Sequence, residues 1–520
     1  MIISLLKRIK KLIIFFPILI YMGQRSYLAY DEGFYALQAR WILDDNNWVI
    51  PQWWGGYNLD RTIGIQYLIA KSQSIFGENP FAAHIPTTLA AFLMILLTYK
   101  LHEELLGKKG AIYSSLILST TYIWLDFAHQ ATQDIIFACL VTTGLYSLTK
   151  IKANKTIFFH ILFGLWIGLA FMMKTFLIAV PIIGLIPYIF EKKKIINYGY
   201  FFTGLLIGFL PFIIWSLAIN QFLEKNIIFY LFGKFSSLSI QNTFTHPFYY
   251  YLWNIPLNFL PWSIFALIGL ITNYKANKNN KIILCYFPII FLIVISTFST
   301  KTPYYPLQIA SILSINTYTG IISIIYSKNL KPIFLFFISK VIPIFIFSCI
   351  FIYCLILKDS INLSLKEELP LLFGLFLFAT SWILINKVNH PKKILNILIL
   401  GPYLFTSLII QSGLFTDRSR NLRESMEKVI ALENLSSKTI YVQKNNITDS
   451  NAHSKIIRIA LLTPNLGKGI DNLNEVSPNE LIWTEESEFE AKENKMFKIL
   501  YKDKYLYPWI LIKKKNYHSD

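Results

Sequence analysis

Long apolar stretches separated by short polar segments recur along this chain from Ile9 to Gln411. The hydrocarbon core of a bilayer is about 30 Å thick, and a helix needs about 20 apolar residues to cross it. The sequence lacks the alternating segments of a transmembrane barrel, so the spans are predicted to be helical. We predict about thirteen transmembrane helices, at residues 9–29, 81–101, 110–126, 132–150, 156–173, 175–190, 198–219, 248–272, 281–299, 303–327, 332–357, 369–386 and 393–413.

The composition agrees with an all-α polytopic membrane protein. Hydrophobic residues make up 54% of the 520 positions, charged residues make up only 15%, and the mean hydropathy is +0.47. A soluble core could not bury so much apolar surface. The four cysteines all lie in apolar stretches, so they indicate neither a disulfide framework nor a metal site.

The composition changes after residue 414, where a polar tail follows the last predicted helix. Residues 423–435 have helical spacing, residues 439–442 indicate a strand, and residues 495–513 indicate one or two more strands. We therefore predict a transmembrane domain over residues 1–414 and a small extracytoplasmic α/β domain over residues 415–520.

Positive charge is distributed unevenly among the predicted loops. Lysine clusters occupy the N-terminal segment and every second loop, at residues 7–11, 150–155, 192–194, 275–281, 328–331 and 387–393. These loops are predicted to be cytoplasmic, which places the first outer loop, at about residues 30–80, and the tail outside. The net charge of +19 then reflects topology and not nucleic-acid binding. The pattern predicts a multi-pass protein of the plasma (inner) membrane with a cytoplasmic N-terminus.

An acidic pair flanked by aromatic residues lies at the outer mouth of the first predicted helix, in Tyr30-Asp31-Glu32-Gly33-Phe34-Tyr35. Adjacent carboxylates are costly to desolvate at this depth, which indicates a reaction site. The alternative is that Asp31 only caps a helix. Asp134, in the second outer loop, has the same two interpretations.

Tryptophans are concentrated in the first outer loop, at Trp41, Trp48, Trp53 and Trp54. We interpret them as part of amphipathic helices that lie on the membrane surface and roof the site. An interfacial aromatic belt is the alternative.

Three cations lie in outer loops, where the positive-inside rule does not expect them. They are Arg61 in the first loop, Lys174 in a very short turn, and Lys301 in the turn before Pro303. Cations near the bilayer surface are suited to bind the phosphate of a lipid-linked substrate and to stabilise it as a leaving group. The alternative is that each of them only anchors a helix end at the headgroups.

Further motifs accompany these charges along the membrane part. They are Asn46-Asn47-Trp48-Val49-Ile50-Pro51, Tyr57-Asn58-Leu59-Asp60-Arg61, Gln133-Asp134, the turn from Gly168 to Lys174, His246-Pro247-Phe248-Tyr249-Tyr250-Tyr251 before Leu260-Pro261-Trp262, and Lys301 with Tyr304. Together with the acidic pair, they resemble the GT-C glycosyltransferases, which include protein O-mannosyltransferases and the bacterial lipid A aminoarabinose transferase. The resemblance covers most of the membrane part and not the tail.

The resemblance implies an inverting glycosyltransferase that moves a sugar from a polyprenyl-phosphate donor to an extracytoplasmic lipid, glycan or protein. It implies that Asp31, Glu32 and Asp134 are catalytic, with Asp31 as the base. It also implies that the donor phosphate is bound by Arg61, Lys174, Lys301 and Tyr304.

Two further site candidates follow from the matching motifs, namely Asp60 and His246. A divalent cation, Mg²⁺ or Mn²⁺, is left open, with Asp31 and Asp134 as its ligands, because carboxylates suit these ions.

A transporter or flippase of a lipid-linked sugar is the alternative function. Transporters place ionisable groups near the bilayer midplane, whereas the charges here lie mostly at the ends of predicted helices, with Lys340 as the main exception. Convergence of Asp31, Asp134, Arg61, Lys174 and Lys301 on one outward site would favour the enzyme, because acid–base catalysis requires hydrogen-bond reach.

Overall fold

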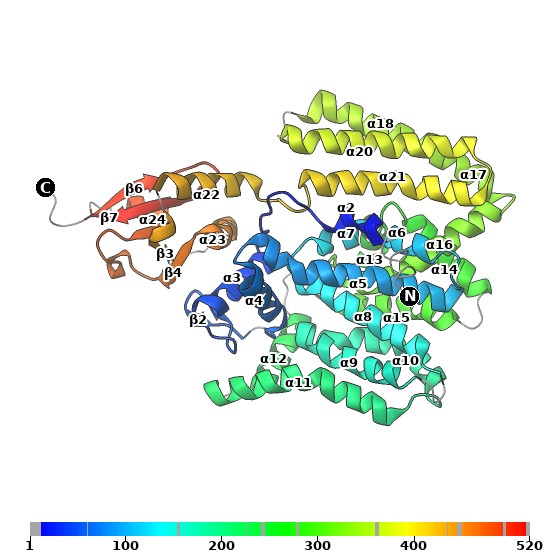
Figure 1. Cartoon of the computed structure of the whole chain (residues 1–520), viewed down its shortest axis with the longest axis horizontal. Helices are drawn as coiled ribbons and strands as arrows, with labels where there is room; N and C mark the ends of the chain where they lie inside the picture. Colours follow the sequence, from blue (N-terminus) through cyan, green and yellow to red (C-terminus); the bar gives the residue numbers. More distant parts are fainter. Residues whose placement is uncertain are drawn as a thin grey trace, which may run out of the picture.

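The computed structural model describes residues 12–59, 61–152, 156–224, 226–240, 245–276, 280–358, 363–433, 435–444, 450–491 and 496–515. A large helical body is joined to a small domain that contains a β-sheet (Figure 1). This arrangement confirms the predicted all-α membrane protein with a small C-terminal α/β domain.

Seven helical stretches in the described part of the chain are long and apolar enough to cross a membrane. They are Pro80–Leu106 (α5), Ile157–Lys192 (α9, Ile157–Lys174, and α10, Ala179–Lys192), Tyr198–Leu223 (α11), Tyr305–Tyr326 (with α16, Ala310–Tyr326), Leu330–Leu357 (with α17, Leu330–Phe336, and α18, Ile342–Ile352), Leu365–Lys387 (with α20, Leu365–Leu384) and Pro391–Ser412 (α21). Two bent pairs raise the number to nine if each pair is one span: α7 (Tyr122–Ala128) with α8 (Gln133–Lys150), and α13 (Tyr250–Asn258) with α14 (Ser263–Ala276).

These stretches are fewer than the predicted spans because polar residues and proline break several apolar runs. In the run predicted at residues 110–126, α6 (Ala111–Leu118) ends where the hydroxyls of Ser119, Thr120 and Thr121 bond to carbonyls of the preceding turn. The run at residues 248–272 breaks between α13 and α14, at Pro261. Other predicted spans are represented by shorter helices, such as α15 (Phe287–Thr297) and α2 (Phe16–Leu19), whereas α12 (Ile227–Ile240) lies between the spans predicted at residues 198–219 and 248–272.

Small residues bring α9 and α11 into close contact. A Cβ atom at Gly168 would lie 2.2 Å from the carbonyl carbon of Gly208, and one at Gly204 would lie 1.9 Å from the oxygen of Ile161. Glycines at this spacing let helix backbones approach each other and pack by dispersion within a membrane. The pairing fixes α9, whose last residue is Lys174.

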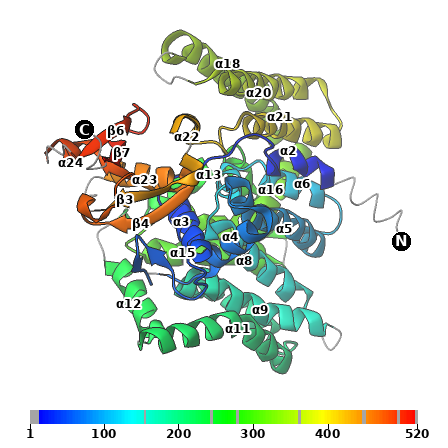
Figure 2. The same cartoon turned by 60° about the vertical axis from the view of Figure 1, so that its left-hand side comes forward.

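The first outer loop forms a compact unit at one end of the helical body. It contains α3 (Asp31–Asp44), the two-stranded hairpin of β1 (Gln52–Trp53) and β2 (Gly56–Tyr57), and α4 (Gly64–Phe76). In both views this unit lies between the membrane helices and the small domain (Figures 1 and 2).

The small domain is built on a five-stranded sheet with the order β4-β3-β5-β7-β6. Strands β4, β3 and β5 are parallel, and β7 and β6 extend the sheet in antiparallel pairing. Its elements are α22 (Arg420–Glu433), β3 (Thr439–Gln443), α23 (Ser450–Leu462), β4 (Asn465–Ile470), β5 (Leu481–Glu485), α24 (Glu486–Ala491), β6 (Phe497–Tyr501) and β7 (Trp509–Lys514). The predicted helix and the predicted strands are therefore present, and β4 and β5 are additional.

A shared hydrophobic cluster joins α3 to the small domain. Leu37, Trp41 and Trp54 from the first outer loop pack with residues that include Met426 and Trp483 from the tail. Trp41 and Trp54 are thus buried between two protein surfaces. The composition boundary at residue 415 does not coincide with a boundary between separate cores.

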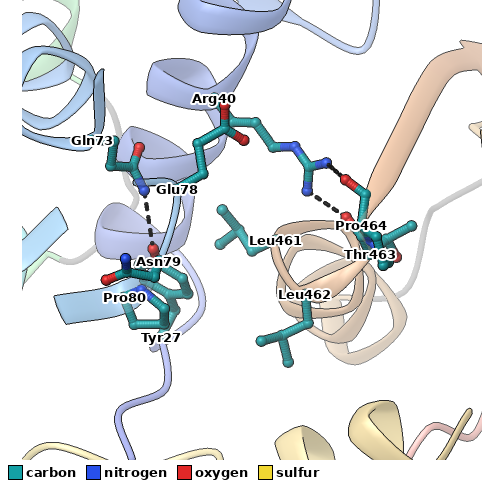
Figure 3. A pocket seen from close by; sticks show the side chains of 10 residues that line it. All are labelled: Tyr27, Arg40, Gln73, Glu78, Asn79, Pro80, Leu461, Leu462, Thr463 and Pro464. Carbon is teal, nitrogen blue, oxygen red and sulfur yellow. Dashed lines mark hydrogen bonds between the residues drawn. The ribbon is translucent and has the colours of Figure 1, made fainter. Parts of the chain in front are cut away.

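Arg40 adds hydrogen bonds to this junction between α3 and the small domain. Its guanidinium donates to the carbonyls of Ala460 at 3.0 Å and Thr463 at 2.6 Å, and also to the carbonyl of Pro464. Figure 3 shows Arg40 reaching from α3 to this segment at the end of α23. Thr463 and Pro464 directly follow the last residue of α23, so the arginine supplies donors to carbonyls at the C-terminal end of this helix.

We expect Arg40→Ala to loosen the small domain from α3. The loss of several charge-assisted hydrogen bonds to buried carbonyls should destabilise the junction by about 2–3 kcal/mol. Limited proteolysis in detergent should show faster cleavage of the tail, and thermal unfolding should begin at a lower temperature.

The matched control for this variant is Asp44→Asn. Asp44 pairs with Arg40 Nε at 3.4 Å, so the control removes an ion pair and leaves the carbonyl bonds in place. Equal rates of tail cleavage in Arg40→Ala and Asp44→Asn would show that the hydrogen bonds from Arg40 to the carbonyls do not hold the small domain in place.

Candidate active site

Asp31 and Arg61 form an ion pair at the start of α3. Asp31 is the first residue of the helix, where the positive end of the helix dipole favours a carboxylate. Arg61 Nη1 lies 3.2 Å from Asp31 Oδ1, and it also donates to the hydroxyl of Tyr35. The guanidinium carbon lies 5.2 Å from the ring centres of both Phe34 and Tyr35. The Asp31 side chain is 47% exposed, so this carboxylate is accessible.

Asp134 and Lys174 form a second ion pair, which is buried. Asp134 lies in the first turn of α8 and Lys174 ends α9, and their side chains are 6% and 7% exposed. Lys174 Nζ donates to Asp134 Oδ1 and lies 4.4 Å from the ring centre of Tyr304. The carboxylate and the aromatic face thus hold the lysine ammonium from two sides.

Two tyrosines connect these ion pairs. Burial raises the pKa of Tyr35 and of Tyr304, and the negative charges of Asp31 and Asp134 raise both values further. Each hydroxyl is therefore within electrostatic range of both carboxylates, and both stay protonated at neutral pH. The structure thus brings Asp31, Arg61, Asp134 and Lys174 together around Tyr35 and Tyr304.

Glu32 has a different environment from Asp31. Its carboxylate is 2% exposed and accepts hydrogen bonds from the amides of Leu28 at 2.6 Å and Ala131 at 2.7 Å, and from His84 Nε2 at 2.7 Å. Burial alone would raise the pKa of Glu32, but the His84 ion pair and the two amide bonds lower it below its ordinary value. The carboxylate is thus engaged inside the protein by three partners, and the predicted catalytic role of Glu32 stays a prediction.

Lys301 lies in the turn that precedes Tyr304, but its ammonium faces backbone carbonyls. Nζ donates to the oxygens of His246 at 2.9 Å and Phe298 at 2.5 Å, and burial lowers the pKa of the lysine. The exposed ring of His246 stacks on Tyr250 with 4.3 Å between ring centres. These contacts engage Lys301 and His246 within the turn, and their predicted roles in donor binding and in the site stay predictions. Asp60 lies outside the described residues.

The carboxylates that were considered as metal ligands both face cationic side chains. Asp31 faces Arg61 and Asp134 faces Lys174. In the described part of the chain, no group of three or more histidine, cysteine, aspartate or glutamate side chains is arranged to hold a metal ion. A divalent cation between Asp31 and Asp134 would be repelled by both cations, so this arrangement does not fit one.

Two residues of this site were not singled out from the sequence. His84 lies in the first turns of α5, where nothing in the sequence links it to Glu32. Tyr35 belongs to the acidic motif, and its position four residues after Asp31 places it on the same helix face. That spacing is a signal that could have identified Tyr35.

Comparisons with known proteins show which sequences and which fold this chain resembles. A family model described as dolichyl-phosphate-mannose-protein mannosyltransferase matches residues 60–215. An undecaprenyl phosphate-alpha-4-amino-4-deoxy-L-arabinose arabinosyl transferase of Photorhabdus laumondii is 26% identical over 290 residues, which cover 53% of this chain and 52% of that protein. The relative of the same name from Shewanella sediminis is 26% identical over 394 residues, covering 72% and 69%.

The chain thus spans only about half the length of several of these curated relatives. One solved structure matches nearly the whole chain. The crystal structure of ArnT from Cupriavidus metallidurans bound to undecaprenyl phosphate superimposes with a TM-score of 0.77 at 14% identity, over 98% of this chain and 97% of that chain. This likeness confirms the predicted GT-C-type fold.

We expect Glu32→Gln to destabilise the folded protein by about 3–5 kcal/mol, because it removes a buried charge that pairs with His84 and accepts two amide hydrogen bonds. Since folding lowers the pKa of Glu32, the stability that it contributes is fully present above the ordinary glutamate pKa of about 4.3. It is lost as the pH falls through the lower value of the folded state. Unfolding measured in detergent over a pH series should therefore show the wild type approaching the variant at acidic pH.

The control is Glu191→Gln, which changes an exposed glutamate at the other end of the helical body. It should shift neither the stability nor its pH dependence. A Glu32→Gln protein as stable as the wild type at neutral pH would contradict the role given to the ion pair.

Proposed function

We propose that this GT-C-fold membrane protein is an inverting glycosyltransferase, which moves a sugar from a polyprenyl-phosphate donor to an extracytoplasmic acceptor. The observation that carries the proposal is the convergence of two carboxylate–cation pairs, Asp31 with Arg61 and Asp134 with Lys174, around two buried tyrosines. The names of the relatives, which specify an undecaprenyl-phosphate sugar donor, support a lipid-linked donor here.

Arg61 and Lys174 are the groups that bind the donor phosphate in this proposal. A phosphate carries the same sign of charge as the carboxylates that they face, and it offers more acceptor oxygens. The donor phosphate therefore takes over hydrogen bonds that the carboxylates hold in its absence. The Tyr304 hydroxyl, beside Lys174, is a further donor that stays protonated.

The reaction is a single displacement at the anomeric carbon. An acceptor oxygen forms a bond to this carbon as the bond from the carbon to the phosphate oxygen breaks, which inverts the configuration. Asp31 accepts the proton of the acceptor hydroxyl, and the bonding electrons leave with the polyprenyl phosphate. Arg61 and Lys174 stabilise the extra negative charge on the departing phosphate. No step of this reaction requires a metal ion bound by Asp31 and Asp134.

The other acidic residues have supporting roles. Asp134 holds Lys174 in place beside Tyr304, and Glu32 fixes the turn from which Asp31 projects. Asp31 is suited to the role of base because it is accessible, whereas Glu32 and Asp134 are buried. The acceptor is a lipid, a glycan or a protein that presents a hydroxyl or phosphate oxygen.

The proposed orientation places this site outside the plasma membrane. The lysine-rich segment around residues 192–194 follows α10 and is assigned to the cytoplasm, as is the N-terminus. Lys174 ends α9 and precedes α10, whose other end carries residues 192–194, so Lys174 is then at the outer surface with the small domain.

We expect Asp31→Asn to lower the turnover about 10²-fold or more while donor binding is largely retained, because the amide keeps the size of the side chain and loses its basicity. Lys174→Met should weaken the apparent donor affinity and also lower turnover, since the lysine contacts the phosphate both in the bound donor and as the phosphate departs from the sugar. Transfer from a radiolabelled polyprenyl-phosphate sugar in membranes, with folded yield measured in parallel, tests both effects.

Asp45→Asn is the matched control, because it changes an exposed carboxylate at the other end of the same helix.

Lys301→Met distinguishes a structural role of this lysine from a role in donor binding. If the role is structural, the variant should lower the thermal stability and leave the apparent donor affinity unchanged. The same assay with EDTA, and then with Mg²⁺ or Mn²⁺ added, tests metal dependence. Wild-type transfer by well-folded Asp31→Asn would refute its assignment as the base. Movement of the donor lipid between leaflets without any transfer would favour a flippase.

We expect single cysteines placed at Lys193 and Lys468 of a cysteine-free protein to show opposite sidedness. An impermeant maleimide added to intact cells should label position 468, on the exposed edge of the small domain, and should leave position 193 unlabelled until the cells are opened. The reverse pattern would place the site in the cytoplasm and would contradict the proposed orientation.

A further inference from the structure

A pocket of about 170 Å³ lies between the chain that follows α2 and the first turns of α5. Leu19, Ile20, Ile85 and Leu89 give it apolar walls, and Arg25 and His84 are its ionisable groups. Leu89 is 62% exposed on a helix that crosses the membrane, so the pocket borders the lipid-facing surface. None of the residues proposed for catalysis or for donor binding lines it.

Arg25 is the unusual group in this pocket. The residue is only 5% exposed, and its Nε and Nη1 atoms are buried without a hydrogen-bond partner among the described residues. The guanidinium carbon lies 5.8 Å from the ring centre of Phe81, at the pocket wall. Burial lowers the pKa of Arg25 to about 10, against the opposing effect of Glu32, so the side chain is still charged at neutral pH.

The surrounding charges do not balance this arginine. Glu32 is the carboxylate that acts on Arg25 among the residues that the structure describes, and it already accepts bonds from His84, Leu28 and Ala131. His84 also engages this carboxylate, with Nε2 2.7 Å from Glu32 Oε1, while its Nδ1 lies 2.5 Å from the oxygen of Pro80. The hydrogen bonds of Glu32 thus go to other groups and none reaches Arg25, and a buried charge without a partner is costly.

We propose that Arg25 binds the phosphate of an anionic membrane lipid, whose acyl chain covers the apolar walls of the pocket. Guanidinium groups bind phosphate oxygens through paired hydrogen bonds, and Nε and Nη1 form one such pair of donors. A lipid fits better than a free phosphate ion because most of the lining is apolar and borders the bilayer. This site is separate from the donor site at Arg61 and Lys174, and it does not depend on the proposed transfer reaction.

The contacts of Glu32 connect this lipid site to the outer loop. Glu32 lies next to Asp31 in the chain and shares its charge with Arg25 and His84. A bound phosphate would relieve the excess positive charge behind the first turn of α3. The lipid is therefore expected to stabilise the folded protein, because it binds the native state and not the unfolded chain.

The first experiment measures lipid retention. The full-length protein is purified with phosphatidylglycerol present, and the lipid that remains bound is counted by native mass spectrometry. Arg25→Gln should retain about tenfold less than the wild type, as expected for the loss of a charge-assisted contact. Arg25→Lys, which keeps the charge, should retain an intermediate amount, and Lys71→Gln, which changes an exposed lysine on α4, should behave as the wild type. Equal retention by the wild type and Arg25→Gln would overturn the proposal.

The second experiment identifies the source of the phosphate. Phosphatidylglycerol, diacylglycerol and inorganic phosphate are added separately to delipidated protein in detergent, and the melting temperature is recorded. Only phosphatidylglycerol should raise it, and this rise should be absent in Arg25→Gln and smaller in Arg25→Lys. The lysine variant keeps the comparison decisive if the glutamine variant folds poorly. An equal rise with inorganic phosphate would overturn the lipid assignment, and an equal rise with diacylglycerol would overturn the phosphate contact.

Discussion

The buried carboxylate of Glu32 is the constraint on which the arrangement of the site depends. It bonds to the amide of Leu28, just before α3, to His84 on α5, and to the amide of Ala131, just before α8. Asp31 follows Leu28 by three residues, and Asp134 follows Ala131 by three residues. One side chain thus fixes both loops that carry the paired carboxylates. The distance between Asp31 and Asp134 follows from this contact and from the packing of α5 against α8.

The other side of α3 is held by the small domain. Arg40 bonds to the carbonyls at the end of α23, and Trp41 packs into the core of the tail. A helix that is held from both sides keeps its first residue, Asp31, in a defined position while the carboxylate itself stays accessible. Precise placement of this kind is what acid–base catalysis requires, because a small displacement lengthens the hydrogen bond to the substrate.

The sequence identified those site residues that can be recognised from their immediate sequence neighbours. The acidic motif, Asp134 and the two cations Arg61 and Lys174 could be singled out because charges at the outer ends of apolar segments are costly without a role. Lys301 looked the same in the sequence, yet its ammonium bonds to two carbonyls. The difference depends on which partners the fold brings within reach, and no local pattern contains that information.

Other limits of the sequence have the same origin. Apolar length indicates a membrane span, but it does not show that the hydroxyls of residues 119–121 end a helix, or that α13 and α14 bend by 111°. The tryptophans of the first loop were interpreted as a roof on the membrane surface, whereas Trp41 and Trp54 pack against the small domain. Their burial depends on the packing of segments almost 400 residues apart, since Trp54 and Met426 belong to the same hydrophobic cluster.

The most direct test of the central claim is a cryo-electron microscopy structure of the protein in nanodiscs with a polyprenyl phosphate. We expect density for the phosphate within hydrogen-bond distance of both Arg61 and Lys174, with Asp31 open to the acceptor side and Glu32 still bonded to His84. A phosphate bound at another place, with both carboxylate–cation pairs undisturbed, would contradict the claim that these pairs form the donor site.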